Sequence, residues 1–228
     1  MRNLIILLSM LAAGWSAGQD GAAMMMVMGQ SIPTDGLISY VDFEAVGQVV
    51  TDSIGGGSGT GDVNVVFGDY GLRGKGMFGG AGTATTSFGD YDTLDFAENT
   101  AFTLSIWAKM PNTSYYGYPV RKEAARGYYM FFQLASDQIV YKIAQTQYDT
   151  GVTDLLDNQW HHLAITRNAS GSVKMYVDSE VIDSRTNAAS AASTGVFSFG
   201  PIYGYVDEFR AYNRELTADE INQLYIYR

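Results

Sequence analysis

Apolar and polar residues alternate along much of this chain, which is the pattern of β-strands that bury one face. The segment 102–110 shows it well, with side chains in two sets on opposite faces: Phe102, Leu104, Ile106 and Ala108 on one, and Thr103, Ser105, Trp107 and Lys109 on the other. Further short strands are expected from Leu37 onward and at 63–67, 83–88, 128–134, 139–143, 161–167, 173–177, 196–199 and 205–212. Many short strands between turn signals predict an all-β antiparallel sandwich or jelly roll.

One helix is predicted near the C-terminus. Thr217 and Glu220 have the spacing of a capping box, and the apolar residues that follow recur at helical spacing. The glycine-rich segment 55–61 is predicted to be a flexible loop. It is not a phosphate-binding loop, because no Lys-Ser/Thr pair follows it.

The first 35 residues have a different pattern. Arg2 precedes an apolar stretch at 4–15, which is typical of a secretory signal peptide and too short for a transmembrane span. A second, Met-rich apolar cluster at 22–28 favours an uncleaved arm that packs against another subunit of an assembly. Both interpretations stay open. We expect an extended apolar arm with a linker over residues 1–35 and one domain over residues 36–228.

Composition and charge exclude some classes of function. Lys and Arg total 14 against 24 Asp and Glu, which gives a formal net charge of −10. Nucleic-acid binders need a surplus of positive charge, so no nucleic-acid partner is expected. The chain has no cysteine, which excludes disulfides, thiolate metal sites and a lipid anchor on cysteine.

Four stretches carry a family resemblance. They are GLISYVDFE at 36–44, FTLSIWAK at 102–109, WHHLAITR at 160–167 with KMYVD at 174–178, and GYVDEFRAYNRELT at 204–217. In order and spacing they resemble the LamG-like jelly-roll domains of the concanavalin A-like lectin/glucanase superfamily. The resemblance implies two antiparallel sheets packed face to face. The Tyr-rich stretch 115–129 is not part of it, and Val41 stands where an aromatic residue is common.

The sequence offers little for catalysis. The two histidines, His161 and His162, are neighbours on a predicted strand, so they point to opposite faces and are expected to be structural. Glycoside cleavage needs two carboxyls on either side of one bond. The Glu-x-Asp-x-x-Glu motif of the superfamily's glucanases is absent, and Asp178 and Glu180 are expected in a hairpin turn. We therefore predict that the chain is not an enzyme.

Calcium is the metal that the sequence favours, because its ligands are carboxylate and carbonyl oxygens. Asp207 lies between apolar residues of a predicted strand, and a buried carboxylate must be paired, hydrogen-bonded or metal-bound. If the first and last strands pair, as the resemblance suggests, Glu44, Asp52 and Asp207 could converge on one ion. Hydrogen bonds from Arg210 or a backbone N–H to Asp207 are the favoured alternative.

Five tyrosines form the candidate ligand or interface surface: Tyr115, Tyr116, Tyr118, Tyr128 and Tyr129. Aromatic faces beside polar groups suit stacking on sugars or contact with another protein. The alternative is an aromatic core edge with no binding role.

These observations predict a non-enzymatic surface module with a lectin-like fold. The favoured function is a structural, decoration or attachment protein of a virion, with a tailed phage as the leading choice, held to other subunits by the N-terminal arm. The alternative is a secreted or cell-surface bacterial carbohydrate-binding or adhesion module. The location is then a virion surface or extracellular.

Overall fold

The computed structural model describes residues 31–111, 117–133 and 136–227, and the account below concerns these residues. Fourteen strands form one continuous hydrogen-bonded sheet system. The strands are β1 (Leu37–Val41), β2 (Val49–Thr51), β3 (Ser58–Gly61), β4 (Val65–Gly68), β5 (Gly76–Asp90), β6 (Phe102–Lys109), β7 (Gly117–Glu123), β8 (Gly127–Gln133), β9 (Gln138–Ile143), β10 (Thr146–Asp149), β11 (Trp160–Arg167), β12 (Ser172–Val177), β13 (Glu180–Thr186) and β14 (Val196–Tyr212). A 3-10 helix, η1 (Asp92–Leu94), and an α-helix, α3 (Ala218–Ile226), complete the elements.

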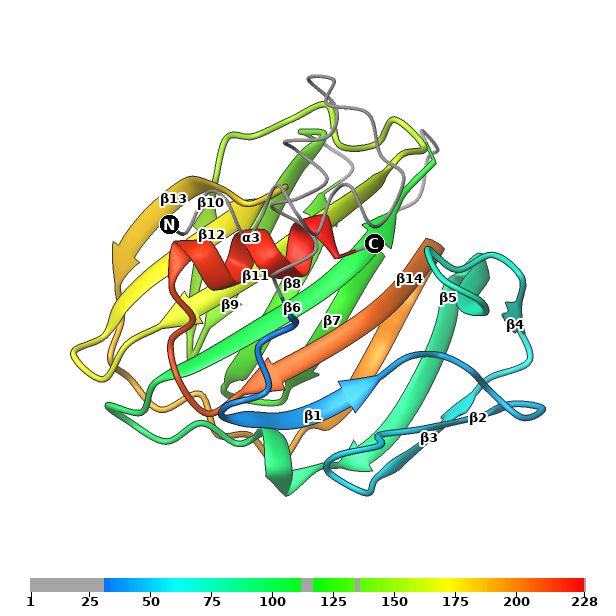
Figure 1. Cartoon of the computed structure of the whole chain (residues 1–228), viewed down its shortest axis with the longest axis horizontal. Coiled ribbons are helices and arrows are strands. Elements are labelled where there is room, and N and C mark those ends of the chain that lie inside the picture. Colours follow the sequence, from blue (N-terminus) through cyan, green and yellow to red (C-terminus); the bar gives the residue numbers. More distant parts are fainter. Residues whose placement is uncertain (1–30, 112–116, 134–135, 228) are drawn as a thin grey trace, which may run out of the picture.

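The strands form two layers that share the long strands β5 and β14 (Figure 1). In the first layer the C-terminal half of β14 lies between β1 and β6, and β11, β12 and β13 follow. In the second layer the N-terminal half of β14 pairs with β7, and β8, β9 and β10 follow. The β5–β14 pairing shifts register between Phe199 and Tyr203, where the strands pass from one layer to the other. The predicted antiparallel sandwich is confirmed.

The core lies between the two layers. Phe102, Leu104, Ile106 and Ala108 of β6 are at most 1 % exposed, and all four belong to one cluster with inward side chains of β8 and β9. Full burial of a large apolar side chain contributes roughly 1.5–3 kcal/mol. The alternation in the sequence therefore assigned the buried face of β6 correctly.

Helix α3 covers the outer surface of the first layer (Figure 1). The predicted capping box is present: the Thr217 hydroxyl accepts from the Glu220 N–H, and the Glu220 carboxylate accepts from the Thr217 N–H. Ile221 and Leu224 then pack on Tyr176 and other outward side chains of the layer. Among the described residues, no helix is long and apolar enough to cross a membrane.

Two strands lie in segments for which the sequence predicted no strand. Residues 58–61, within the predicted flexible loop, form β3, where a Cβ on Gly59 would stand 2.3 Å from the Phe88 ring. This glycine therefore permits a close approach rather than flexibility. Part of the Tyr-rich stretch forms β7, and its Pro119 lies where the register with β8 shifts, a position at which a strand tolerates proline.

Candidate functional site

The outer surface of the second layer carries a row of polar and aromatic side chains that face away from the core. Cross-strand register places the row across seven strands, in the order Thr60, Ser87, Ser198, Arg121, Tyr129, Lys142 and Gln147. Residues in register on neighbouring strands share a face, so these groups form one continuous surface. Such a surface offers hydrogen-bond donors and acceptors to an elongated ligand.

An aromatic cluster borders this row. The rings of Tyr118 and Phe131 stack with their centroids 4.4 Å apart, and Tyr129 meets Tyr118 edge-on at 5.3 Å. The Arg121 guanidinium lies 5.0 Å from the Tyr118 ring centroid, and the Lys142 ammonium lies 5.8 Å from that of Tyr129. Cations near ring faces stabilise such arrangements.

Polar contacts fix the orientation of these groups. The Tyr129 hydroxyl donates to Gln147 Oε1 at 2.6 Å, and burial raises the pKa of that hydroxyl to about 12. Glu123 accepts from Lys142 and forms an ion pair with Arg121 at 3.5 Å. We call the surface made by Tyr118, Arg121, Glu123, Tyr129, Phe131, Lys142 and Gln147 the open face. It combines stacking rings with preoriented polar groups, which is the chemistry of a sugar-binding surface.

The structure divides the tyrosines that the sequence singled out. Tyr118 and Tyr129 lie on the open face, although the surrounding side chains leave Tyr129 only 7 % exposed. Tyr128 was a wrong choice, because it is 0 % exposed in the core and its hydroxyl donates to the Leu94 carbonyl. Tyr115 and Tyr116 lie outside the described residues. Alternation along β8 could have separated the two sets, since it places Phe131 beside Tyr129 and turns Tyr128 inward.

The structure does not bring Glu44, Asp52 and Asp207 together as one group of ligands. Asp52 accepts three backbone N–H groups and the Tyr91 hydroxyl. Glu44 accepts from the Lys75 N–H at 2.8 Å. Asp207 accepts from the backbone N–H groups of Arg73 and Glu208, so the alternative of hydrogen bonding describes its surroundings. Calcium binding itself stays a prediction.

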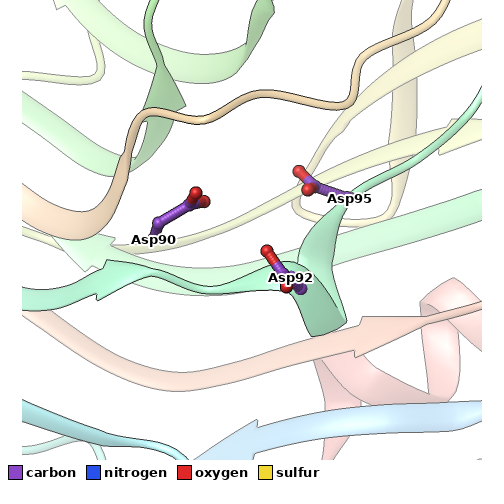
Figure 2. Close-up of side chains that lie close together, drawn as sticks. All are labelled: Asp90, Asp92 and Asp95. Atoms are coloured by element: carbon purple, nitrogen blue, oxygen red, sulfur yellow. The ribbon is translucent and has the colours of Figure 1, made fainter.

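A different set of carboxylates converges in the described part of the chain: Asp90, Asp92 and Asp95, which Figure 2 shows turned toward one another. The ammonium of Lys122, fully buried, lies 3.0 Å from Asp90 Oδ1 and 2.9 Å from Asp95 Oδ1. It also donates to the Tyr91 carbonyl at 2.9 Å. The lysine thus pairs with two of the three carboxylates, and it does so on the inward side of β7, next to Arg121 on the same strand.

The two histidines point to opposite faces, as predicted. His161 lies between Asp178 and Asp157, and the hydrogen bond to Asp178 raises its pKa. His162 is buried beside Ser105, and burial lowers its pKa to about 3, so it is neutral. Asp178 lies in the predicted turn, with φ of 49°. Both ring nitrogens of His161 thus have partners, whereas His162 has one at Nε2 and none at its buried Nδ1 among the described residues.

A family model described as the concanavalin A-like lectin/glucanases superfamily matches residues 78–222. The chain belongs to this superfamily. A comparison with curated protein sequences finds no match. The superfamily assignment confirms the resemblance of the sequence and agrees with the two-layer fold.

Several solved structures are similar to this member of the superfamily. The binding domain of Paraclostridial Mosquitocidal Protein 1 matches at 16 % identity and a TM-score of 0.69, over 83 % of this chain and 52 % of that one. The ligand-binding domain of botulinum neurotoxin serotype D, solved with N-acetylneuraminic acid, matches at 14 % identity and 0.66, over 84 % and 51 %. The chain thus spans about half the length of these two domains.

A third structure is matched over almost its whole length. Domain 4 of AbnA, a GH43 extracellular arabinanase from Geobacillus stearothermophilus solved with arabinotriose, matches at 21 % identity and a TM-score of 0.64. The match covers 82 % of this chain and 97 % of that one. At these identities the likeness establishes the lectin-like fold alone.

Proposed function

We propose that this chain is a non-catalytic carbohydrate-binding module and that its open face holds the glycan. The observation that carries the proposal is the stacked pair of Tyr118 and Phe131 beside a row of polar side chains. Sugar rings have one apolar face that stacks on aromatic rings, and hydroxyls at the rim that need donors and acceptors. Two of the similar structures were solved with a sugar, which supports this class of ligand.

The carboxylates on this surface favour binding over cleavage. Glu123 is engaged by Arg121 and Lys142, and Asp149 accepts from the Gln147 amide at 2.9 Å. A glycosidase requires two carboxyls on either side of the scissile bond. Groups that orient one another in this way serve recognition rather than that chemistry.

The full chain is tested first on an array of glycans, and affinity is then measured by calorimetry. Tyr118→Ala removes one ring of the stack, and we expect about tenfold weaker binding. Val181→Ala is the control, since Val181 is 50 % exposed on β13, at the edge of the first layer, and lies off the open face. Equal affinity of the Tyr118 variant and the original chain would contradict the proposal. Formation of new reducing ends when the chain is incubated with the glycan would also contradict it, because they indicate hydrolysis.

The compartment and the attachment are also part of this proposal. The signal-like residues 4–15 favour an extracellular location, either secreted or on a cell surface. A virion role with anchoring by residues 1–35 stays a prediction, because residues 1–30 lie outside the described part of the chain. A mass spectrum of the native protein distinguishes these possibilities, since loss of about 20 N-terminal residues would exclude the anchor.

A further inference from the structure

A second aromatic surface lies on the opposite side of the sandwich, on the outer surface of the first layer. Cross-strand register places Trp160, Lys109, Tyr205, Phe78 and Val66 in one row across β11, β6, β14, β5 and β4. Tyr70 lies beside the row, 45 % exposed like Val66. We call Trp160, Lys109, Tyr205, Phe78 and Tyr70 the aromatic strip.

The rings of the strip contact one another in sequence across the sheet. Phe78 and Tyr205 stack with centroids 4.7 Å apart and an interplanar angle of 27°. Tyr70 lies 5.9 Å from Phe78, and Trp160 lies 6.4 Å from Tyr205. Because neighbouring strands are about 4.8 Å apart, the row presents one side chain after another at intervals comparable with a sugar unit. This spacing suits a linear chain of sugars that crosses the strands.

The charges at the strip differ from those of the open face. The Lys109 ammonium lies 5.3 Å from the Tyr205 ring centroid, and among the described residues it forms no ion pair. Arg73 also has no carboxylate partner among them, and its guanidinium lies 4.0 Å from the Tyr227 ring centroid. On the open face, by contrast, both cations pair with Glu123.

The position of Arg73 connects this second cation to the strip. Its N–H donates to Asp207 at 3.1 Å, and Asp207 is two residues beyond Tyr205 on β14. Tyr70, in the same loop, has its ring centroid 6.0 Å from that of Tyr205. Two cations without an ion pair therefore accompany a row of stacking rings, in a chain with a net charge of −10.

We propose that the aromatic strip is a second binding surface, for a linear polysaccharide that carries carboxylates. Sugar rings stack on Phe78, Tyr205 and Trp160, and a carboxylate of the chain pairs with Lys109. The charge complementarity is local to the strip, because the rest of the chain is acidic and repels a polyanion. Salt screens the attraction between Lys109 and the ligand carboxylate, so we expect it to weaken binding. This surface is independent of the open face.

The experiment uses the full chain with polygalacturonate and with its fully methyl-esterified form, which has the same backbone without the charge. We expect the acid form to bind more tightly, and Lys109→Gln to weaken that binding about fivefold. Phe78→Ala is expected to weaken it about tenfold by removing a stacking ring. Lys174→Gln is the matched control, because Lys174 is paired with Glu215 away from the strip.

Several results would overturn this assignment. The first is equal binding of the acid and ester forms. The second is unchanged binding by Lys109→Gln, provided that this variant unfolds in urea like the original chain. The third is self-association in sedimentation that Phe78→Ala abolishes. The last result would assign the strip to contact between two copies. Tyr118→Ala on the open face is expected to leave polygalacturonate binding unchanged, so failure of the strip and failure of the open face are distinguishable.

Discussion

The two outer surfaces of the sandwich are built by the same alternation but have different environments. On the first layer, Trp107 and His162 face outward and are nevertheless buried, because α3 lies over them. On the second layer, Arg121 and Lys142 face outward and stay partly exposed. An outward position thus stays accessible to a ligand only where no other element covers it.

The contacts explain how the cover is held. Tyr225 of α3 stacks on Trp107 with centroids 5.7 Å apart and an interplanar angle of 16°. Beyond the helix, the Asp207 carboxylate accepts a hydrogen bond from the Arg73 backbone N–H and so holds that loop. The open face uses its rings differently, since Tyr118 stacks on Phe131 of the neighbouring strand. The comparison therefore predicts losses of stability on the covered side and losses of binding on the open side.

The largest effect is expected from Trp107→Ala. Trp107 is 1 % exposed between the sheet and α3, so truncation leaves a cavity and should lower the free energy of unfolding by about 3–5 kcal/mol. Trp160→Ala is the matched control on the same layer, where the side chain is only partly buried, and should cost less than about 1 kcal/mol. Urea unfolding measures both, and similar losses would contradict the distinction between covered and uncovered positions.

Asp207 gives the covered side a dependence on pH. Burial raises its pKa to about 7 from an ordinary value of 3.8, so the folded chain holds a proton that the unfolded chain releases between these values. Stability that is present below pH 4 should therefore be lost as the pH rises toward 7, by on the order of 1 kcal/mol per pH unit. Urea titrations across this window measure the slope. Asp207→Asn should flatten it, and an unchanged slope in that variant would assign the dependence to another group.

Lys122→Met tests the support beneath the open face. The lysine is fully buried and its ammonium donates to the Tyr91 carbonyl and pairs with two carboxylates, Asp90 and Asp95, which are 46 % and 27 % exposed. Because water can partly solvate the carboxylates once the ammonium is gone, we expect a loss of about 2 kcal/mol. Lys174→Met, whose side chain is 39 % exposed and pairs with Glu215 at 3.7 Å, should change the free energy of unfolding by less than about 0.5 kcal/mol. Thermal unfolding of both variants measures the difference, and an equal loss would show that burial of Lys122 does not matter.

The alternation of apolar and polar residues predicted the structure better than did the grouping of similar residues that are close in sequence. The two faces of 102–110 follow from strand geometry alone, and the structure has them as expected. The tyrosines at 128 and 129 were instead grouped by proximity in sequence, which ignored the same rule. Pro119 concealed β7, because its place at a register shift depends on the partner strand.

The surroundings of Asp207 could not be predicted in the same way. Its donor, the N–H of Arg73, is 134 residues away in sequence, and no local pattern announces which backbone segment will approach a buried carboxylate. The cross-strand rows also depend on which strands become neighbours, and adjacent strands in the layers are often distant in sequence. The sequence therefore predicts which face of a strand is buried, but it does not predict the register between strands.

The smallest expected effect gives the sharpest form of the comparison, because it uses two adjacent residues of one type on opposite faces of β8. Tyr129→Phe keeps the ring and removes the hydrogen bond to Gln147, so glycan affinity should fall about threefold while the free energy of unfolding changes by about 1 kcal/mol or less. Tyr128→Phe removes a hydroxyl that donates to the Leu94 carbonyl inside the core. It should cost a similar amount of stability and leave glycan affinity unchanged. Calorimetry with the glycan and urea unfolding of both variants separate the two effects, and equal losses of affinity would mean that the glycan does not distinguish the two faces of this strand.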